Sequence, residues 1–78
     1  MNVARVTAVL QEHGISHTMI APHVIRVTWL VDGSSQPVID FDVKHNFTRF
    51  IGRFRHMTGK DKTELKSVVE RLKVVNVH

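Results

Sequence analysis

The sequence predicts a small α+β domain of two layers, in the order α-β-β-α-α, with an antiparallel hairpin packed on the helices. Apolar residues recur at helical spacing near the N-terminus, alternate with polar residues over 23–44, and return to helical spacing from residue 46. A chain of 78 residues is too short to divide further. We therefore expect one domain covering residues 1–78.

The first predicted helix covers residues 3–13. Gly14 follows it, and a glycine commonly terminates a helix because it adopts the left-handed conformation at low cost. The apolar positions fall at i, i+3, i+6 and i+7 and form one stripe, which consists of Val3, Val6, Val9 and Leu10.

Residues 24–31 and 39–44 are predicted to be the two strands of a β-hairpin. Side chains of both runs alternate between apolar and polar, and the turn-rich residues 32–36 separate them. Residues 17–20 either add a short strand or only lead into the hairpin. The hairpin is the structural prediction that rests on the clearest pattern.

The two faces of the first strand are expected to differ. Trp29 is on the inward face, where we expect it to lie in the core close to Phe41 of the second strand. Val24 and Leu30 point outward and mark a second contact surface, such as a dimer interface.

Two helices are predicted after the hairpin. The first covers residues 46–57, where three phenylalanines and Ile51 fall on one stripe that we expect to cap the sheet. The second begins at Asp61, three residues before Glu64, in the manner of a capping box. Its tail, residues 74–77, either frays or forms an edge strand. Its apolar face consists of Leu65, Val68, Val69 and Leu72.

Composition excludes several classes of protein. The chain has no cysteine, which excludes disulfides, thiolate metal sites and cysteine nucleophiles. No apolar run approaches the ~20 residues of a membrane span, and residues 1–10 lack the pattern of a secretion leader. We expect a cytoplasmic protein with no membrane partner. Because so short a chain buries a small core, a homodimer is one way to supply further burial.

Positive charge is concentrated in one segment. The formal net charge is +4, and residues 44–62 contain six Lys and Arg residues against Asp61 alone. Like charges four residues apart on a helix repel each other weakly, so an anion is expected nearby. The candidate binding residues for a nucleic acid or an acidic partner are Lys44, Arg49, Arg53, Arg55, His56, Lys60 and Lys62.

The sequence leaves three explanations of this segment open. The leading one is contact with the phosphates of DNA or RNA. The second is contact with an acidic protein surface. The third is an ordinary solvated face, or pairing with the chain's own Asp40 and Asp42.

Gly52 interrupts the predicted helix and has two explanations. It either permits close approach of the backbone to a phosphate or another helix, or it shortens the helix. Residues 49–55 interleave aromatic and basic side chains as some RNA-binding strands do, but the spacing is helical and the βαββαβ order of that class is missing. The last two helices only approximate a helix-turn-helix.

Two catalytic or metal-binding patterns are weak. Asp42, Val43 and Lys44 form the acidic-x-Lys triplet of small metal-dependent nucleases, but the second carboxylate, Asp32, is expected far away at the hairpin turn, with Asp42 pairing near Val27. Another pattern, His13 and His17, has the spacing of a helical zinc pair but lacks a third ligand. We expect no catalytic residue, no metal and no cofactor.

The sequence thus favours a non-catalytic small regulatory domain that binds nucleic acid. The alternative is a protein-protein interaction or inhibitor module of the kind that phages and mobile elements encode, acting on an acidic partner. A small metal-dependent nuclease is the remote alternative.

Overall fold

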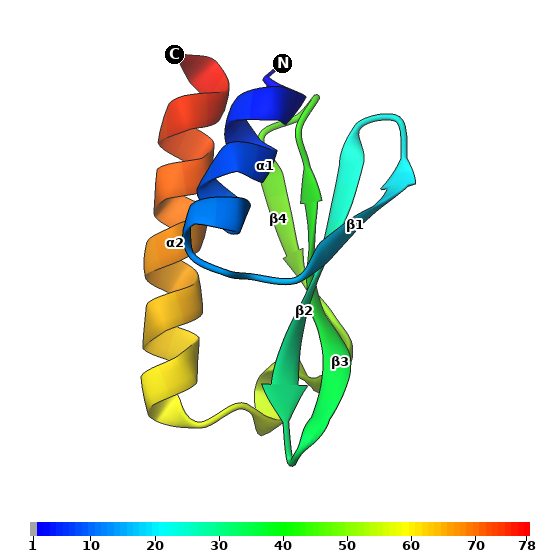
Figure 1. Cartoon of the computed structure of the whole chain (residues 1–78), viewed down its shortest axis with the longest axis vertical. Helices are drawn as coiled ribbons and strands as arrows, with labels where there is room; N and C mark the ends of the chain where they lie inside the picture. The colour runs from blue at the N-terminus through cyan, green and yellow to red at the C-terminus, as the bar shows by residue number, and fades with distance from the viewer. Residues whose placement is uncertain (1) are drawn as a thin grey trace.

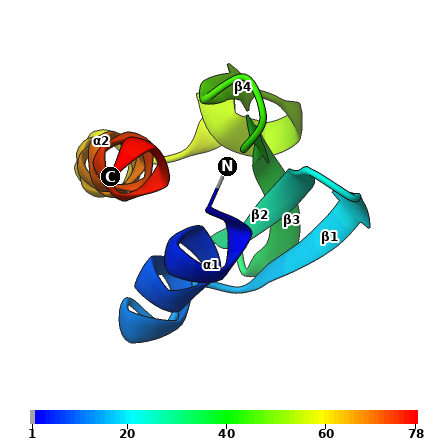
Figure 2. The ribbon, with the colours of Figure 1, turned by 90° about the horizontal axis from the view of Figure 1, so that it is seen from above.

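The computed structural model describes residues 2–78, which form two layers (Figure 1). One layer is a four-stranded antiparallel sheet whose strands follow in chain order, and the other consists of two helices. Figure 2 shows both helices on the same side of the sheet. The α+β class is confirmed. The elements are α1 (Val3–Glu12), β1 (His17–Ala21), β2 (Val24–Val31), β3 (Ser34–Asp42), β4 (Phe47–Phe50), the 3-10 helix η1 (Gly52–His56) and α2 (Gly59–Val77).

The N-terminal elements follow their sequence pattern. The helix α1 ends where predicted, with His13 as its C-cap and Gly14 in the left-handed conformation at φ 65°. Residues 17–20, left undecided by the sequence, belong to the edge strand β1. This strand pairs with β2 and extends the hairpin to three strands.

The β2–β3 hairpin is confirmed, with a shorter turn than predicted. Asp32 and Gly33 alone form it, with φ values of 52° and 81°, and such a two-residue turn matches the twist of the flanking strands. An extra residue in β3, Val38, shifts the register partway along. The two-residue turn pairs Trp29 with Gln36, so the predicted proximity of Trp29 to Phe41 is wrong.

The predicted helix over residues 46–57 is wrong. This stretch forms β4, which pairs with β3, and then η1. The break is made by Gly52, which has φ 53° and which η1 uses as its first residue. Since only one α-helix follows the hairpin, the approximate helix-turn-helix is wrong as well.

The C-terminal helix α2 begins earlier than predicted. Thr58 is its N-cap and accepts a hydrogen bond from the Asp61 backbone N–H at 3.1 Å, so Asp61 lies in the first turn. The helix continues through Val77, and the tail forms no edge strand. Within residues 2–78, neither α1 nor α2 combines the length and the apolar character that a membrane-spanning helix requires.

The core lies between the sheet and the two helices. Both helices contribute their apolar stripes, and the inner face of the sheet contributes the rest. Its largest fully buried side chains are Phe41, Leu10, Ile25, Ile39, Leu65 and Leu72. The other face of the sheet carries Arg26, Asp40, Asp42 and Arg49, whose registers place them side by side on neighbouring strands.

Candidate functional site

The predicted binding residues follow one another along β4, η1 and the first turn of α2, with one exception. Lys44 lies in the turn before β4, at the opposite end of that strand from η1. Those that remain are exposed, apart from the half-buried Lys62. We call this set the basic strip; its members are Arg49, Arg53, Arg55, His56, Lys60 and Lys62.

The 3-10 helix holds part of the basic strip against β3. Ile51 donates its backbone N–H to the carbonyl oxygen of Val38 at 2.9 Å, and Gly52 then turns the chain. A Cβ at Gly52 would lie 2.5 Å from the carbonyl oxygen of Pro37. Gly52 therefore both ends the regular element and allows close backbone approach, but the approach is to β3 rather than to a phosphate or a second helix.

The arginines of the basic strip do not pair with Asp40 or Asp42. Arg26 contacts both carboxylate oxygens of Asp40, at 2.9 and 3.0 Å, and this hydrogen-bonded contact raises the pKa of Arg26. The carboxylate of Asp42 accepts from His45, which lowers the pKa of Asp42. The internal pairing that the sequence left open with these two residues is therefore wrong.

One arginine of the strip does have an internal partner. Arg53 lies 3.3 Å from Asp32 in an exposed ion pair, which contributes little to stability in water. Among residues 2–78, neither Arg49 nor Arg55 has a carboxylate oxygen within 4.0 Å. Neither guanidinium group forms an ion pair within the described chain, although Arg49 lines a hollow together with Asp40 and Asp42.

Aromatic side chains adjoin the basic strip. Phe47 and Phe50 are 56% and 43% exposed, so the predicted capping of the sheet by these side chains is wrong. The rings of Phe50 and Phe54 lie 4.3 Å apart, and the ammonium group of Lys62 lies 5.5 Å from the centre of the Phe54 ring. The helical spacing of the phenylalanines did not predict these exposed rings. Gly52 was the feature of the sequence that argued against a continuous helix.

Three hollows surround β4. One of about 280 Å³ lies beside η1 and is lined by Phe50, Gly52 and Arg55 among others. Another, of about 250 Å³, lies on the outer face of the sheet and includes Phe47 and Arg49. The last, of about 290 Å³, lies between β4 and α2. The short strand β4 thus has concave surface on three sides.

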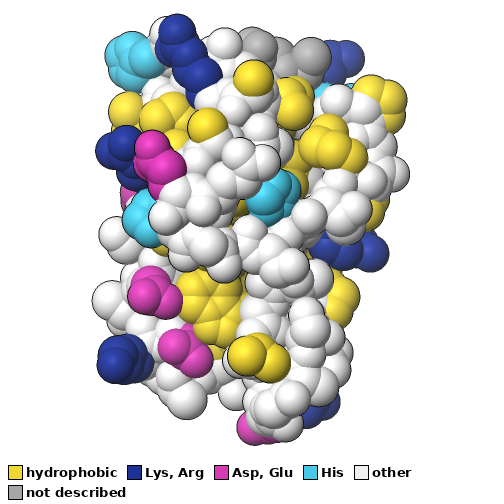
Figure 3. All heavy atoms as spheres, in the orientation of Figure 1, with side chains coloured by type: hydrophobic (Ala, Val, Ile, Leu, Met, Phe, Trp, Pro, Cys, Tyr) yellow, Lys and Arg dark blue, Asp and Glu magenta, His cyan; other side chains and the backbone are white. Residues whose placement is uncertain are grey.

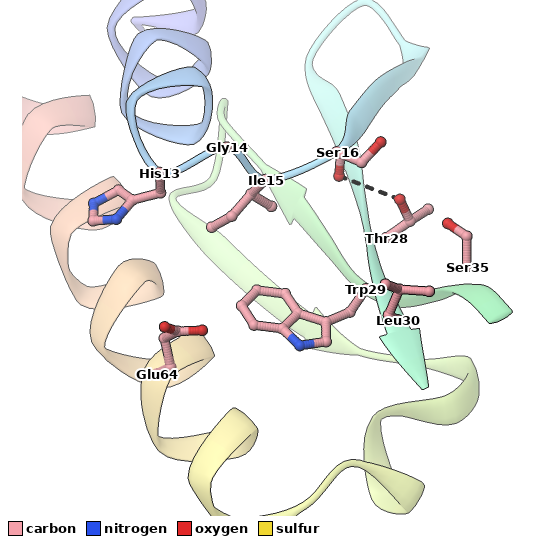
Figure 4. A pocket seen from close by; sticks show the side chains of 9 residues that line it. All are labelled: His13, Gly14, Ile15, Ser16, Thr28, Trp29, Leu30, Ser35 and Glu64. Atoms are coloured by element: carbon pink, nitrogen blue, oxygen red, sulfur yellow. Dashed lines mark hydrogen bonds between the residues drawn. The ribbon is translucent and has the colours of Figure 1, made fainter. Parts of the chain in front are cut away.

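A larger hollow than these three lies elsewhere, between the end of α1, β2 and α2. Figure 4 shows the indole of Trp29 extending from β2 toward α2, with His13 and Glu64 beside it. Its volume is about 330 Å³. Trp29 packs against the core as predicted but is only partly buried. No residue of the basic strip lines this hollow, and Figure 3 shows Lys and Arg side chains separated along the rim of the same face.

The structure does not bring together the residues of the predicted nuclease pattern or those of the predicted zinc pair. Asp32 and Asp42 flank opposite ends of β3, and Asp42 pairs with Val24 rather than near Val27. The imidazole Nδ1 of His17 lies 2.8 Å from the backbone oxygen of Ile15. Within residues 2–78, no three His, Asp or Glu side chains form a group that could hold a metal ion.

Comparison with known proteins adds no family: no protein-family model, no curated protein and no solved structure matches this chain.

Proposed function

We propose that the protein is a non-catalytic domain that binds single-stranded nucleic acid through the basic strip and the adjoining phenylalanines. One observation carries the proposal. Arg55 lines the hollow beside η1 together with the exposed ring of Phe50, and Arg49 lines the outer-face hollow together with the exposed ring of Phe47. Among residues 2–78, neither arginine has a carboxylate oxygen within 4.0 Å. Arginine and an aromatic ring are the pair that contacts phosphate and stacks on a base.

The single-stranded form is favoured by the aromatic ring. A base stacks on a side chain only after it leaves its neighbours, which costs least in an unpaired strand. Phe50 is held by Phe54 at 4.3 Å, so little side-chain freedom remains to be lost on stacking. Lys60 and Lys62 extend the positive surface from η1 to the start of α2. Since a ring stacks on any base, the proposal covers DNA and RNA.

The second candidate is an acidic protein partner at the same surface. It is supported by the position of β4, an edge strand whose outer side carries no further strand of the described chain. Either partner is consistent with the proposal of a cytoplasmic regulatory domain. The side chain of Leu30 points outward and is 69% exposed, which supports a homodimer as part of the proposal.

The test is fluorescence anisotropy with labelled oligothymidylate, oligouridylate and a duplex. We expect tighter binding of the single strands at about 50 mM salt, and a log-log salt slope near −3, equivalent to about four phosphate contacts. Arg49→Ala with Arg55→Ala should reduce the magnitude of the salt slope by about 1.4. Phe50→Leu should weaken binding about tenfold and leave the salt slope unchanged.

A matched control is Arg5→Ala with Arg71→Ala, which removes the same charge from exposed positions of α1 and α2 outside the basic strip. Equal losses in the two double variants would reduce the interaction to net charge and contradict the proposal. Absence of binding to every nucleic acid at about 50 mM salt would eliminate it in favour of the acidic protein partner.

A further inference from the structure

The two edges of the sheet differ in how they are protected. The β1 edge has an irregularity between Met19 and Ala21, and Pro22 follows directly. Bulges and prolines prevent a further strand from pairing. The β4 edge has neither feature over its four residues. It is therefore the edge at which another strand can add.

The hydrogen-bonding groups of β4 that face this edge follow from the ladder. Ile51 donates to Val38 of β3, and groups of an antiparallel strand point alternately to its two sides. The backbone N–H and C=O groups of Phe47 and Arg49 accordingly face β3. The backbone N–H and C=O groups of Thr48 and Phe50 face away from it, toward the free edge.

A groove accompanies the free edge. The hollow of about 290 Å³ runs between β4 and α2, with Lys66, Val69 and Lys73 on the helix side. Thr48 contributes to its wall; this residue is 9% exposed, and its Oγ1 has no hydrogen-bond partner among the described residues. A buried hydroxyl without a partner costs free energy, so a ligand with a polar group has something to gain there.

We propose that an extended acidic peptide of a partner protein adds to the β4 edge as a fifth strand and occupies the groove beside α2. Backbone groups of Thr48 and Phe50 supply the pairing, and the half-exposed rings of β4 cover the peptide's apolar side chains. This inference rests on the second candidate function, the acidic protein partner, and makes it specific; its charged contacts, Lys66 and Lys73, are not part of the basic strip.

Charge selects the occupant. The helix side of the groove has two positive side chains, Lys66 and Lys73, and one negative side chain, Glu70. The ammonium group of Lys66 also lies 6.0 Å from the centre of the Phe54 ring. A second copy of this chain would bring an identical β4 with its own Arg49 and the same lysines to the two-fold axis, where like charges repel. An acidic segment has complementary charge at the same place.

The experiment uses the whole chain and two probe peptides. The first is an acetylated, amidated heptapeptide in which Glu alternates with Val and Thr; the second has Lys in place of every Glu. Amide-resolved NMR should show the acidic probe binding with a Kd below about 1 mM. Hydrogen exchange at the amides of Thr48 and Phe50 should slow at least about tenfold at saturation, because these amides become hydrogen-bonded.

Two double variants separate the groove from net charge. Lys66→Glu with Lys73→Glu should weaken the acidic probe at least about tenfold and favour the basic one. The matched control, Arg5→Glu with Arg71→Glu, makes the same charge change outside the groove and should have little effect. Both variants are compared by circular dichroism, since exposed or half-exposed helix positions should tolerate the changes.

Three results would overturn the proposal. One is equal binding of the acidic and basic probes. Another is binding of the acidic probe without slower exchange at Thr48 and Phe50. The third is slow exchange at both amides without peptide, together with a dimer by sedimentation, which would assign the edge to a second copy. The nucleic-acid proposal is tested with variants of the basic strip, and the peptide proposal with variants of Lys66 and Lys73. Failure of one proposal therefore does not imply failure of the other.

Discussion

The two turns that flank β3 are held in different ways. The β2–β3 turn consists of Asp32 and Gly33, whose positive φ values suit the hairpin without help from elsewhere. The β3–β4 turn, residues 43–46, depends on α2: the side-chain amide of Asn76 donates to the Val43 carbonyl oxygen at 2.8 Å and to Asn46 Oδ1 at 2.9 Å. One turn is encoded locally, while the other is completed by a residue 30 positions later.

This difference extends to the strands that the turns position. Strands β2 and β3 have residues that alternate between core and surface, so their local pattern and their final place agree. Strand β4 has four residues, three of them exposed, and packing alone provides little to hold it. Its position, and that of the basic strip, is set by contacts at both ends: Asn76 before it and Gly52 after it.

The largest effect is expected from Gly52→Ala. A side chain at φ 53° is strained, and the new Cβ would lie 2.5 Å from the Pro37 carbonyl oxygen, so η1 must move away from β3. We expect a loss of about 3 kcal/mol of unfolding free energy by urea denaturation. Gly59→Ala is the control: its Cβ would meet nothing within 4 Å, and alanine in the helix should be neutral or stabilising by up to about 1 kcal/mol.

A small loss at Gly52→Ala would show that η1 can repack, which would remove the claim that β3 fixes the basic strip. If Gly59→Ala destabilised as strongly, the effect would be a general one of glycine replacement. Crosspeak shifts confined to β4, η1 and their neighbours would instead localise the change as expected.

The sequence correctly predicted the elements whose secondary structure is determined by their local pattern of apolar residues. The alternation of β2 and β3 and the apolar stripes of α1 and α2 all led to the correct element. The prediction of a helix over residues 46–57 was wrong because the spacing of Phe50 and Phe54 does not require an α-helix. With Phe50 in β4 and Phe54 in η1, the two rings still lie 4.3 Å apart. Gly52, which is unfavourable inside a helix, was the residue that indicated the break.

The candidate site could be predicted only in part, for the same reason. Residues 49–62 are basic in any conformation, so their collective charge was readable from composition. The sequence did not predict which of the basic residues lie together: Lys44, which precedes this range, is at the far end of β4, and Arg53 is paired with Asp32 of the β2–β3 turn. The groove of Lys66 and Lys73 requires the packing of α2 beside β4, which no local pattern encodes.

An intermediate effect is expected from Asn76→Ala. Asn76 is 3% exposed, and its backbone and side chain also bind Asn2, so the residue links both chain ends to the β3–β4 turn. Its loss would leave the buried Val43 carbonyl oxygen without this donor, and we expect about 2 kcal/mol of destabilisation. Ser67→Ala, an exposed polar-to-alanine change on the same helix, should alter stability by less than about 0.5 kcal/mol.

The Asn76 result also sharpens the comparison of the two turns. Amide exchange should speed up at Asn46 and along β4 in this variant, while the Asp32–Gly33 turn keeps its protection. Equal acceleration at both turns would mean that the chain loosens as a whole, and the distinction between a local and a completed turn would fail.

The smallest effect concerns Asp42 and His45 at the start of the β3–β4 turn. The Asp42 carboxylate accepts the His45 backbone N–H at 3.1 Å and lies 2.8 Å from its Nδ1, and this hydrogen bonding lowers the pKa of Asp42. A carboxyl group whose folded pKa lies below its unfolded value stabilises the fold above the unfolded pKa, near 4, and loses that contribution as the pH falls through the folded pKa. Stability should therefore decline on acidification in this window.

The double-mutant cycle of Asp42→Asn and His45→Ala tests this link by urea denaturation. Each single change should lower the urea midpoint at about pH 6, and the double variant should lose less than the sum, because the two residues act together. The coupling should shrink as the pH falls below about 4, because Asp42 is protonated first in the unfolded state and then, at its lowered pKa, in the folded state. Coupling of undiminished size at the acidic end would show that the neutral hydrogen bond, and not the carboxylate charge, holds this turn, which would make it as self-contained as the Asp32–Gly33 turn.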